Sequence, residues 1–306
     1  MWIVGSIALF ALAAYGAVTL ALRNNPHAVL DTVDSVAGPS NGVEQVHSES
    51  TGDHPQQRLI VYREEGSAAA LPVFVFFHGG SWSHGDPGDY GFIARNMAPE
   101  GFVVVLGGYR LGEAGRYPAM LEDTAAVIAW VNANIEQHGG DPSRIFVGGH
   151  SAGAYNVAQV ALETRWLEEA GAPPEAIRGV VGLAGPYDFF PFDSDSTRAA
   201  FESAGAGETS QPVNHVRTDA PPMLLVHGSD DTLVKPRNSR TLAERLEGVG
   251  SRVELLFLPE GDHNAPLLGL ANPWRRNPRV HDAVTNFMTR IASGGEVSVP
   301  VQPQTP

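Results

Sequence analysis

A serine, an aspartate and a histidine in this sequence each follow an apolar run, and the serine stands in the most informative pattern. Ser151 is the centre of a G-x-S-x-G pattern at residues 149–153, after the apolar run 145–147 and before a helix-like segment. A strand, a sharp turn and a helix in this order hold a serine hydroxyl exposed, and the flanking glycines let neighbouring backbone come close. In a chain with 34 glycines the pattern alone also fits a plain glycine-rich turn. The rest of the chain therefore has to supply partners for the serine.

An acid and an imidazole occur after two later apolar runs. Residues 227–231 read H-G-S-D-D and residues 259–264 read P-E-G-D-H-N. Because ligands bind beyond the carboxyl ends of the strands in an open α/β sheet, we expect Ser151, Asp231 and His263 to meet there. A serine hydroxyl needs an imidazole to take its proton, and the imidazole needs a carboxylate to hold its tautomer. The sequence predicts Ser151 as nucleophile, His263 as general base and Asp231 as orienting acid.

Neighbouring residues offer alternatives for these roles. Asp230 competes with Asp231, which we favour because it lies one residue further past the strand end. A turn or helix-cap role is the alternative for both aspartates. We expect His150 and His227 to bond to nearby backbone, and His78 to brace its own loop.

The stretch after the apolar run 71–77 suits a substrate oxyanion. It reads H-G-G-S-W at residues 78–82, and glycines allow backbone amides to approach a ligand closely. We expect the oxyanion hole to be formed by the amides of Gly79, Gly80, Ser81 and Ala152. Trp82 is open to two roles, a wall of the acyl pocket or a cap on the core. The sequence contains no H-x-x-x-H pair or carboxylate cluster, so it favours neither a metal site nor a cofactor.

Apolar runs alternate with helical patterns through most of the chain. This alternation predicts an α/β fold with a mostly parallel central sheet and helices on both faces. Residues 186–220, which contain Phe189, are expected to form a small cap over the site. The predicted strands are 58–63, 71–77, 102–106, 145–147, 179–183, 223–226 and 253–258, and the predicted helices are 88–98, 119–137, 152–170, 237–247 and 278–292.

The amino terminus has a different character. Residues 2–22 carry no charged side chain, and as a helix they would span roughly 30 Å, the hydrocarbon thickness of a bilayer. No basic residue precedes the run and Arg23 closes it, which favours an uncleaved membrane anchor over residues 1–23. A cleaved signal segment, giving a secreted or periplasmic protein, and a buried helix are the alternatives. With a single flanking arginine, the side of the membrane is not indicated.

Composition and turn residues set the remaining boundaries. The formal charge of −14 argues against nucleic acid as a partner, because phosphate binding needs lysine and arginine. The absence of cysteine excludes disulfides and a cysteine nucleophile. Residues 24–57 are polar and rich in turn formers and are predicted as a spacer. The catalytic domain is predicted over 58–293, followed by a disordered tail over 294–306.

Five short motifs in matching order resemble the α/β-hydrolase superfamily. Over roughly residues 58–293 the chain is similar to the carboxylesterase branch that includes BD-FAE and kynurenine formamidase-like enzymes. The resemblance implies Ser151, Asp231 and His263 as the triad, and Gly80, Ser81 and Ala152 as oxyanion donors. A stretch that lies beside the pocket in that branch implies Tyr187 and Phe189, with Trp82, as substrate-binding residues. The motifs are H-G-G-S-W at 78–82, Y-R-L at 109–111, Y-P at 117–118, G-D-P at 140–142 and G-H-S-A-G at 149–153, and the pocket stretch is G-P-Y-D-F-F at 185–190.

These features predict a membrane-tethered serine hydrolase that cleaves small carboxylic esters through an acyl-enzyme without a cofactor. Arylformamide hydrolysis is the nearest alternative reaction. A catalytically silent α/β-hydrolase that only binds, and an enzyme acting at a lipid surface, are rivals of other kinds. The apolar amino terminus departs from soluble formamidases and argues against a role in tryptophan breakdown. The sequence does not indicate an oligomeric state or a natural substrate.

Overall fold

The central sheet of the protein contains eight strands in one layer. The computed structural model describes residues 25–38, 42–67, 70–202, 205–274 and 278–294. The strand order is β1-β2-β4-β3-β5-β6-β7-β8. Strands β3 to β8 run parallel, while β1 and β2 pair in antiparallel fashion at one edge. The strands are β1 (Val43–Ser50), β2 (Arg58–Glu64), β3 (Leu71–Phe77), β4 (Val103–Gly107), β5 (Gly140–His150), β6 (Ile177–Leu183), β7 (Met223–Gly228) and β8 (Val253–Leu258).

Both faces of the sheet are buried, which explains the continuous apolar runs in the sequence. Along β3, Val75 and Phe77 join the core on one face, whereas Phe74 and Phe76 join the core on the other. Alternate residues of a strand point to opposite faces, so a strand covered on both sides has to be apolar throughout. The predicted α/β class with a mostly parallel sheet is confirmed.

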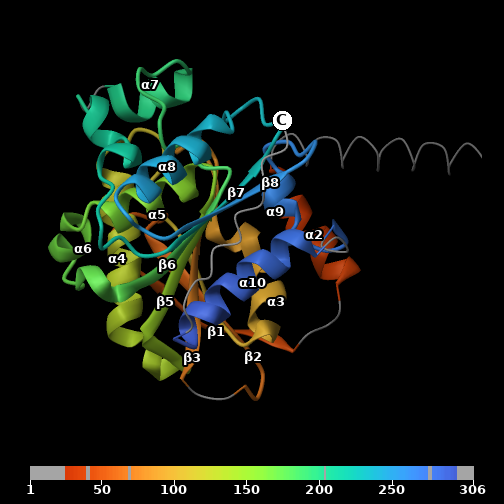
Figure 1. Cartoon of the computed structure of the whole chain (residues 1–306). Coiled ribbons are helices and arrows are strands. Elements are labelled where there is room, and N and C mark those ends of the chain that lie inside the picture. The colour runs from red at the N-terminus through yellow and green to blue at the C-terminus, as the bar shows by residue number, and fades with distance from the viewer. Residues whose placement is uncertain (1–24, 39–41, 68–69, 203–204, 275–277, 295–306) are drawn as a thin grey trace, which may run out of the picture.

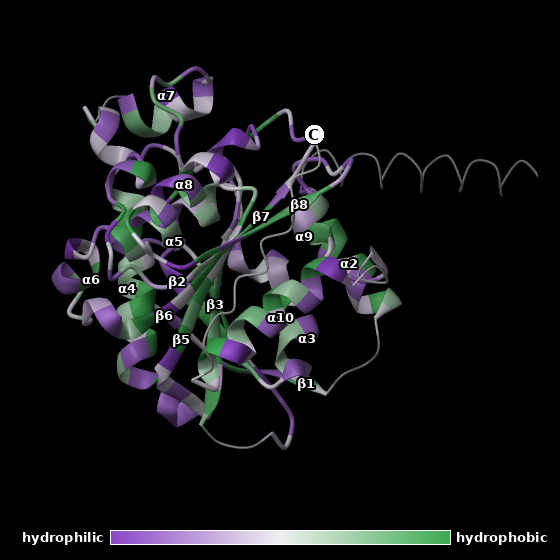
Figure 2. Ribbon diagram, viewed as in Figure 1, coloured by the Kyte–Doolittle hydropathy of each residue, from purple (hydrophilic) through white to green (hydrophobic). Residues whose placement is uncertain are grey.

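Helices cover the sheet from both sides (Figure 1). Figure 2 shows hydrophobic strands inside and hydrophilic residues on the outer faces of the helices. One face carries α4 (Ala119–Asn134), α5 (Ala152–Leu162), α6 (Arg165–Glu169) and α8 (Arg237–Gly248). The other carries α2 (Pro26–Ala37), α3 (Gly91–Met97), α9 (Ala265–Leu268) and α10 (Arg279–Ala292). Short 3-10 helices are η1 (Pro87–Tyr90), η2 (Ala98–Glu100), η3 (Ile135–His138), η4 (Pro174–Ala176), η6 (Gly207–Ser210) and η7 (Pro212–Asn214).

The predicted spacer over residues 24–57 is wrong, because this segment contributes β1 and α2 to the domain. Strand β1 pairs with β2 along its length, from Val43 opposite Glu64 to Ser50 opposite Arg58. It is an edge strand with mostly exposed side chains, and its sequence therefore lacks the apolar run that marks the inner strands.

Helix α2 is attached by a buried carboxylate that sequence periodicity does not reveal. Asp34 is 1% exposed and accepts hydrogen bonds from Arg95 Nε at 2.8 Å, Asn96 Nδ2 at 2.9 Å and the Asn272 amide at 2.7 Å. Buried charges persist only when paired and hydrogen-bonded. These partners come from α3 and from the segment before α10, so α2 joins the folded domain through contacts distant in sequence.

A cap segment between β6 and β7 contains α7 (Asp195–Phe201), η6 and η7. Figure 1 shows α7 projecting from the body of the domain. Ser194 caps α7 reciprocally with Thr197, which defines where the helix begins. The ring of Phe201 lies 4.8 Å from that of Trp82 and 5.2 Å from that of Phe189, so aromatic packing joins the cap to the body.

The predicted anchor or signal segment at 1–23 and residues 295–306 of the predicted tail lie outside the described residues. Within the described part of the chain, no helix combines the length and the apolar character that crossing a bilayer requires.

Candidate active site

Ser151 lies at the tight turn between β5 and α5. Its backbone has φ 53° and ψ −117°, a left-handed conformation that costs a non-glycine residue about 1–3 kcal/mol. The surrounding structure holds it there: the Ser151 amide donates to the Leu183 carbonyl at 2.9 Å, and its carbonyl accepts from the Tyr155 amide at 3.1 Å. The turn thus places the serine at the amino end of α5, at the carboxyl edge of the sheet.

The two glycines of the pattern are required by close backbone contacts. A Cβ at Gly149 would lie 2.4 Å from the carbonyl carbon of Gly153. A Cβ at Gly153 would lie 2.2 Å from the Phe77 oxygen and 2.5 Å from the His78 oxygen. These contacts bring α5 against the end of β3, so the serine turn and the loop after β3 lie side by side.

Asp231 and His263 are joined, as predicted from their positions after β7 and β8. His263 Nδ1 lies 2.7 Å from Asp231 Oδ2, and the Asp231 side chain is fully buried. Asp231 Oδ1 accepts from the amides of Leu233 and Val234, both at 2.9 Å. Burial by itself would raise the pKa of Asp231, but hydrogen bonds from His227 and His263 outweigh it and hold that pKa well below its ordinary value. The carboxylate is therefore charged and fixed.

The competing aspartate takes another role. Asp230 is exposed, and its carboxylate accepts from the Ser229 hydroxyl at 3.0 Å. The geometry thus supports Asp231 as the partner of the imidazole.

His263 lies beside the residue that precedes Ser151. The rings of His150 and His263 are 4.9 Å apart, and His150 Nε2 lies 3.0 Å from the His263 carbonyl oxygen, to which it donates. Burial lowers the pKa of His150 to about 3, with a smaller contribution from His263, so His150 is neutral. His150 bonds to backbone as predicted, but its partner is 113 residues away in the chain instead of nearby. This bond brings the His263 loop to the serine turn.

The loop after β3 carries three of the four predicted oxyanion donors. It is braced by His78, whose Nδ1 lies 2.7 Å from the Gly79 oxygen. The Gly79 amide donates to the Tyr90 hydroxyl at 3.3 Å, so Gly79 is engaged elsewhere and the prediction for it is corrected.

The other donors remain open to a ligand. Gly80, Ser81 and Trp82 have φ of 120°, 51° and 56°, and Ser81, Trp82 and Ala152 line the cavity at Ser151. Within the described part of the chain, no group accepts a hydrogen bond from the amides of Gly80, Ser81 or Ala152. Amides without an internal acceptor at the edge of a cavity are suited to a developing negative charge.

A cavity of about 130 Å³ opens at Ser151. Trp82 and Phe189, both predicted to bind substrate, line it. The Trp82 ring stays in place because its Nε1 donates to Asn156 Oδ1 at 3.1 Å. The lining residues are Ser81, Trp82, Ser151, Ala152, Pro186, Phe189, Asp193, Ser194, Ser196, Thr197, Leu233, Val234, Lys235, Arg237 and Asn238.

Tyr187 does not reach this cavity. The side chain is 0% exposed, and a Cβ at Gly182 of β6 would lie 2.1 Å from its hydroxyl oxygen. The ring fills the space that this glycine leaves over the sheet. Tyr187 is therefore a core residue, which corrects its prediction as a substrate contact.

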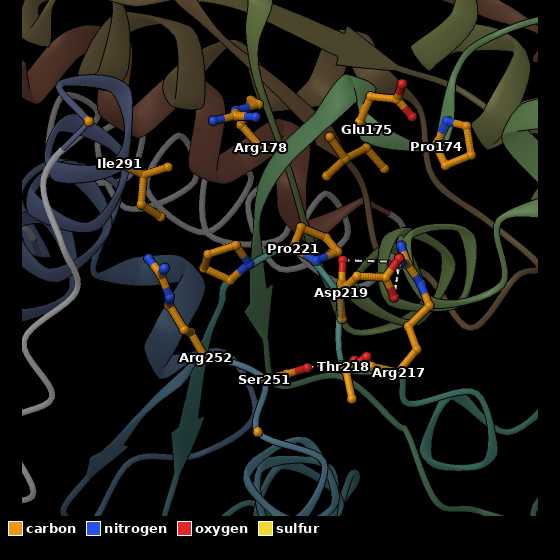
Figure 3. A pocket seen from close by; sticks show the side chains of 15 residues that line it. Pro174, Glu175, Arg178, Arg217, Thr218, Asp219, Pro221, Ser251, Arg252 and Ile291 are labelled. Carbon is orange, nitrogen blue, oxygen red and sulfur yellow. Dashed lines mark hydrogen bonds and ion pairs between the residues drawn. The ribbon is translucent and has the colours of Figure 1, made fainter.

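A larger cavity of about 640 Å³ lies at the other end of the strands, where β6, β7 and β8 begin. Figure 3 shows Arg178, Arg217 and Arg252 around it, near the amino ends of β6, β7 and β8. Strands of this length put roughly 20 Å between the two edges, and none of the predicted site residues lines the larger cavity. Its size therefore does not make it the active site. In the described ranges, no cluster of three or more His, Asp or Glu side chains is arranged to hold a metal ion.

Sequence reasoning missed one contact of the site. His227 Nε2 lies 2.9 Å from the Val234 oxygen, as expected of a backbone partner, but also 3.2 Å from Asp231 Oδ2. The signal in the sequence is the spacing of four residues within H-G-S-D-D, which a tight turn after β7 folds back on itself.

Comparison with known proteins places the chain in a family. The family model described as BD-FAE matches residues 59–246. Esterase LipC of Mycobacterium tuberculosis is 32% identical over 263 residues, which cover 78% of this chain and 64% of LipC. Isoprenylcysteine alpha-carbonyl methylesterase ICME of Arabidopsis thaliana is 29% identical over 233 residues, 69% of this chain and 55% of ICME. The chain thus spans between half and two thirds of the length of these relatives.

Solved structures show the same fold at lower identity. Esterase B from Lactobacillus rhamnosis (HN001) has a TM-score of 0.74 and 18% identity, covering 95% of this chain and 97% of the esterase. A thermostable esterase from Pseudomonas putida ECU1011 has a TM-score of 0.69 and 24% identity, covering 89% and 90%. With this shared fold and a family model that matches residues 59–246 of 306, the chain belongs to the BD-FAE family and has the α/β-hydrolase fold.

Proposed function

We propose that this protein is a serine esterase in which Ser151, His263 and Asp231 form the catalytic triad. The observation that carries the proposal is the 2.7 Å contact between His263 Nδ1 and Asp231 Oδ2, in a loop that His150 binds directly beside Ser151. A carboxylate, an imidazole and a strained serine at one sheet edge match the roles of a Ser-His-Asp triad. LipC and ICME, both named as esterases, support the same reaction class.

The reaction follows from these positions. With its Nδ1 proton held by Asp231, His263 presents Nε2 as the base. Nε2 takes the hydroxyl proton while Ser151 Oγ bonds to the ester carbonyl carbon, and the carbonyl electron pair moves to oxygen. The amides of Gly80, Ser81 and Ala152 receive that oxyanion.

Collapse of this intermediate breaks the bond to the alcohol, which leaves with the proton from His263. Water then attacks the acyl-enzyme by the same route and releases the acid. The charged, buried Asp231 stabilises the imidazolium in both halves of the reaction.

The cavity favours a short acyl group. Trp82 and Phe189, each under 9% exposed, wall a space of about 130 Å³ next to Ser151. The wall is rigid because both rings pack on Phe201 from the cap. Esters of acids of a few carbons fit this space better than long-chain esters.

Replacing the nucleophile tests the proposal. Ser151→Ala should lower turnover of p-nitrophenyl acetate at least about 10⁴-fold and abolish labelling by a fluorophosphonate, while circular dichroism shows the protein still folded. Ser35→Ala, in α2 and remote from the site, is the matched control. Activity that survives Ser151→Ala would refute the assignment, and a folded wild-type protein that neither turns over nor labels would indicate a silent binding protein. Running p-nitrophenyl esters of increasing length beside N-formylkynurenine separates ester from arylformamide hydrolysis.

A further inference from the structure

The Asp231 carboxylate has more partners than the triad requires. Two amides occupy Oδ1, and two imidazoles, His263 at 2.7 Å and His227 at 3.2 Å, occupy Oδ2. A carboxylate offers about four lone-pair directions, and four nitrogen atoms lie within 3.2 Å of this one. The triad mechanism uses only His263. His227, with a side chain that is 0% exposed, has no part in that mechanism.

The hydrogen positions on His227 follow from its neighbours. Nε2 lies 2.9 Å from the Val234 carbonyl oxygen, which can only accept, so Nε2 carries a hydrogen. The same nitrogen lies 3.2 Å from Asp231 Oδ2, so its N–H is also close to the carboxylate. Nδ1 lies 2.7 Å from the Ser239 hydroxyl of α8, which can donate to it. The neutral ring with its hydrogen on Nε2 therefore satisfies all three contacts.

His227 links a residue of a loop to a strand and a helix. Asp231 sits in a loop without regular structure between β7 and α8, whereas His227 belongs to β7 and Ser239 to α8. Catalytic groups must be held to within a fraction of an ångström, and outer hydrogen-bond partners do this for ligating and catalytic side chains. The ring of His227 is the part of the sheet that reaches the loop carboxylate directly.

We propose that His227 is a positioning residue that shares the Asp231 carboxylate with His263, fixing its direction and limiting how strongly it holds the proton of the catalytic imidazole. This proposal rests on the proposed triad. His227 is absent from the cavity lining, so it acts on the reaction through Asp231 and leaves substrate binding unchanged.

The effect on pH dependence follows from the charges around His263. Asp231 and His227 face it from the β7 side, His150 from the end of β5, and His27 of α2 acts on it electrostatically. Within the histidine loop, the Asp262 carboxylate accepts from the amides of Asn264 and Ala265. Removing only the His227 donor leaves more negative charge on Oδ2 for His263, which strengthens its imidazolium. The acid limb of kcat/KM should therefore move to higher pH.

The test compares His227→Phe, which keeps a flat ring without a donor, with His227→Gln, which restores an N–H near the Nε2 position. For p-nitrophenyl acetate we expect His227→Phe to lower kcat about 10- to 100-fold, as for other outer partners of functional histidines, with KM within about twofold and the acid limb shifted upward. His227→Gln should recover most of kcat and the wild-type limb. His281→Phe, on α10 and packed against Asn96 and Glu100, is the matched control for a buried histidine.

Other outcomes would overturn the proposal. If folded His227→Phe keeps the wild-type kcat and pH profile, or if His227→Gln recovers neither, His227 does not position the carboxylate. Should His227→Phe fail to fold, Ser239→Ala decides instead, because it removes the hydroxyl that fixes His227 Nδ1 and so loosens the ring that faces Asp231. The acid limb should then also move to higher pH, and an unchanged acid limb in this variant overturns the proposal. If the wild-type protein has no esterase activity, or if Ser151→Ala keeps it, the proposed triad is wrong, and the role proposed for His227 is not what has failed.

Discussion

Replacing Asp231 by asparagine should abolish most esterase activity, because the surrounding backbone amides fix which way the new side-chain amide points. Asp231 Oδ1 accepts from two backbone amides at 2.9 Å, so only the carbonyl oxygen of an asparagine fits there. Its NH₂ group must then face His263 Nδ1 and His227 Nε2. An NH₂ group can only donate, which forces the His263 hydrogen onto Nε2. In that tautomer His263 cannot accept the proton of Ser151.

The size of the loss follows from this tautomer. Holding the imidazole in the wrong tautomer costs about 10⁴ in kcat, or about 5 kcal/mol of transition-state stabilisation. Folding should suffer less, by about 1.5–3 kcal/mol, because one charged hydrogen-bond network is lost while the volume is kept.

Steady-state turnover of p-nitrophenyl acetate, with protein concentration corrected for folded fraction by urea unfolding, measures both quantities. Asp230→Asn changes the adjacent exposed carboxylate, which touches Ser229 and not His263, and should retain activity within about twofold. A folded Asp231→Asn protein within about tenfold of wild-type kcat would show that this carboxylate does not set the His263 tautomer.

Further predictions concern the neighbouring elements. Burial lowers the pKa of His78 from 6.5 to about 4. Between these two pH values the unfolded chain binds more protons than the folded protein, so the free energy of unfolding falls as pH drops from 6.5 to 4. His78→Asn should remove up to about 3 kcal/mol of that fall, measured by urea unfolding at a series of pH values. Gly153→Ala places a Cβ 2.2 Å from a carbonyl oxygen and should lower the free energy of unfolding by at least about 1–3 kcal/mol, whereas Gly248→Ala, with nothing within 4 Å, should leave it unchanged or slightly higher. Phe189→Ala opens the cavity wall and should raise the octanoate-to-acetate ratio of kcat/KM at least about tenfold; an unchanged ratio would place the acyl group elsewhere.

Local pattern was sufficient for the inner part of the fold. The run 71–77 coincides with β3 and the run 223–226 lies within β7, because an inner strand covered on both faces carries apolar residues at successive positions. Edge strand β1 and helix α2 lacked this constraint. The contact that attaches α2, the buried Asp34 with Arg95 and its neighbours, joins residues far apart in sequence, so no window of the sequence contains it.

Chain order and spacing alone led to the proposed serine, aspartate and histidine, because each follows a strand whose end can be predicted from the apolar runs of the sequence. Only the tertiary structure decided which contacts the residues next to them make. The Gly79 amide, predicted as an oxyanion donor, donates instead to the Tyr90 hydroxyl, and the Tyr187 ring fills the space over Gly182. His227 Nε2 lies 3.2 Å from the Asp231 carboxylate, a contact that the sequence did not predict. Hydrogen bonds and close packing depend on directions and distances between elements, and those are fixed only when the sheet, the helices and the cap assemble.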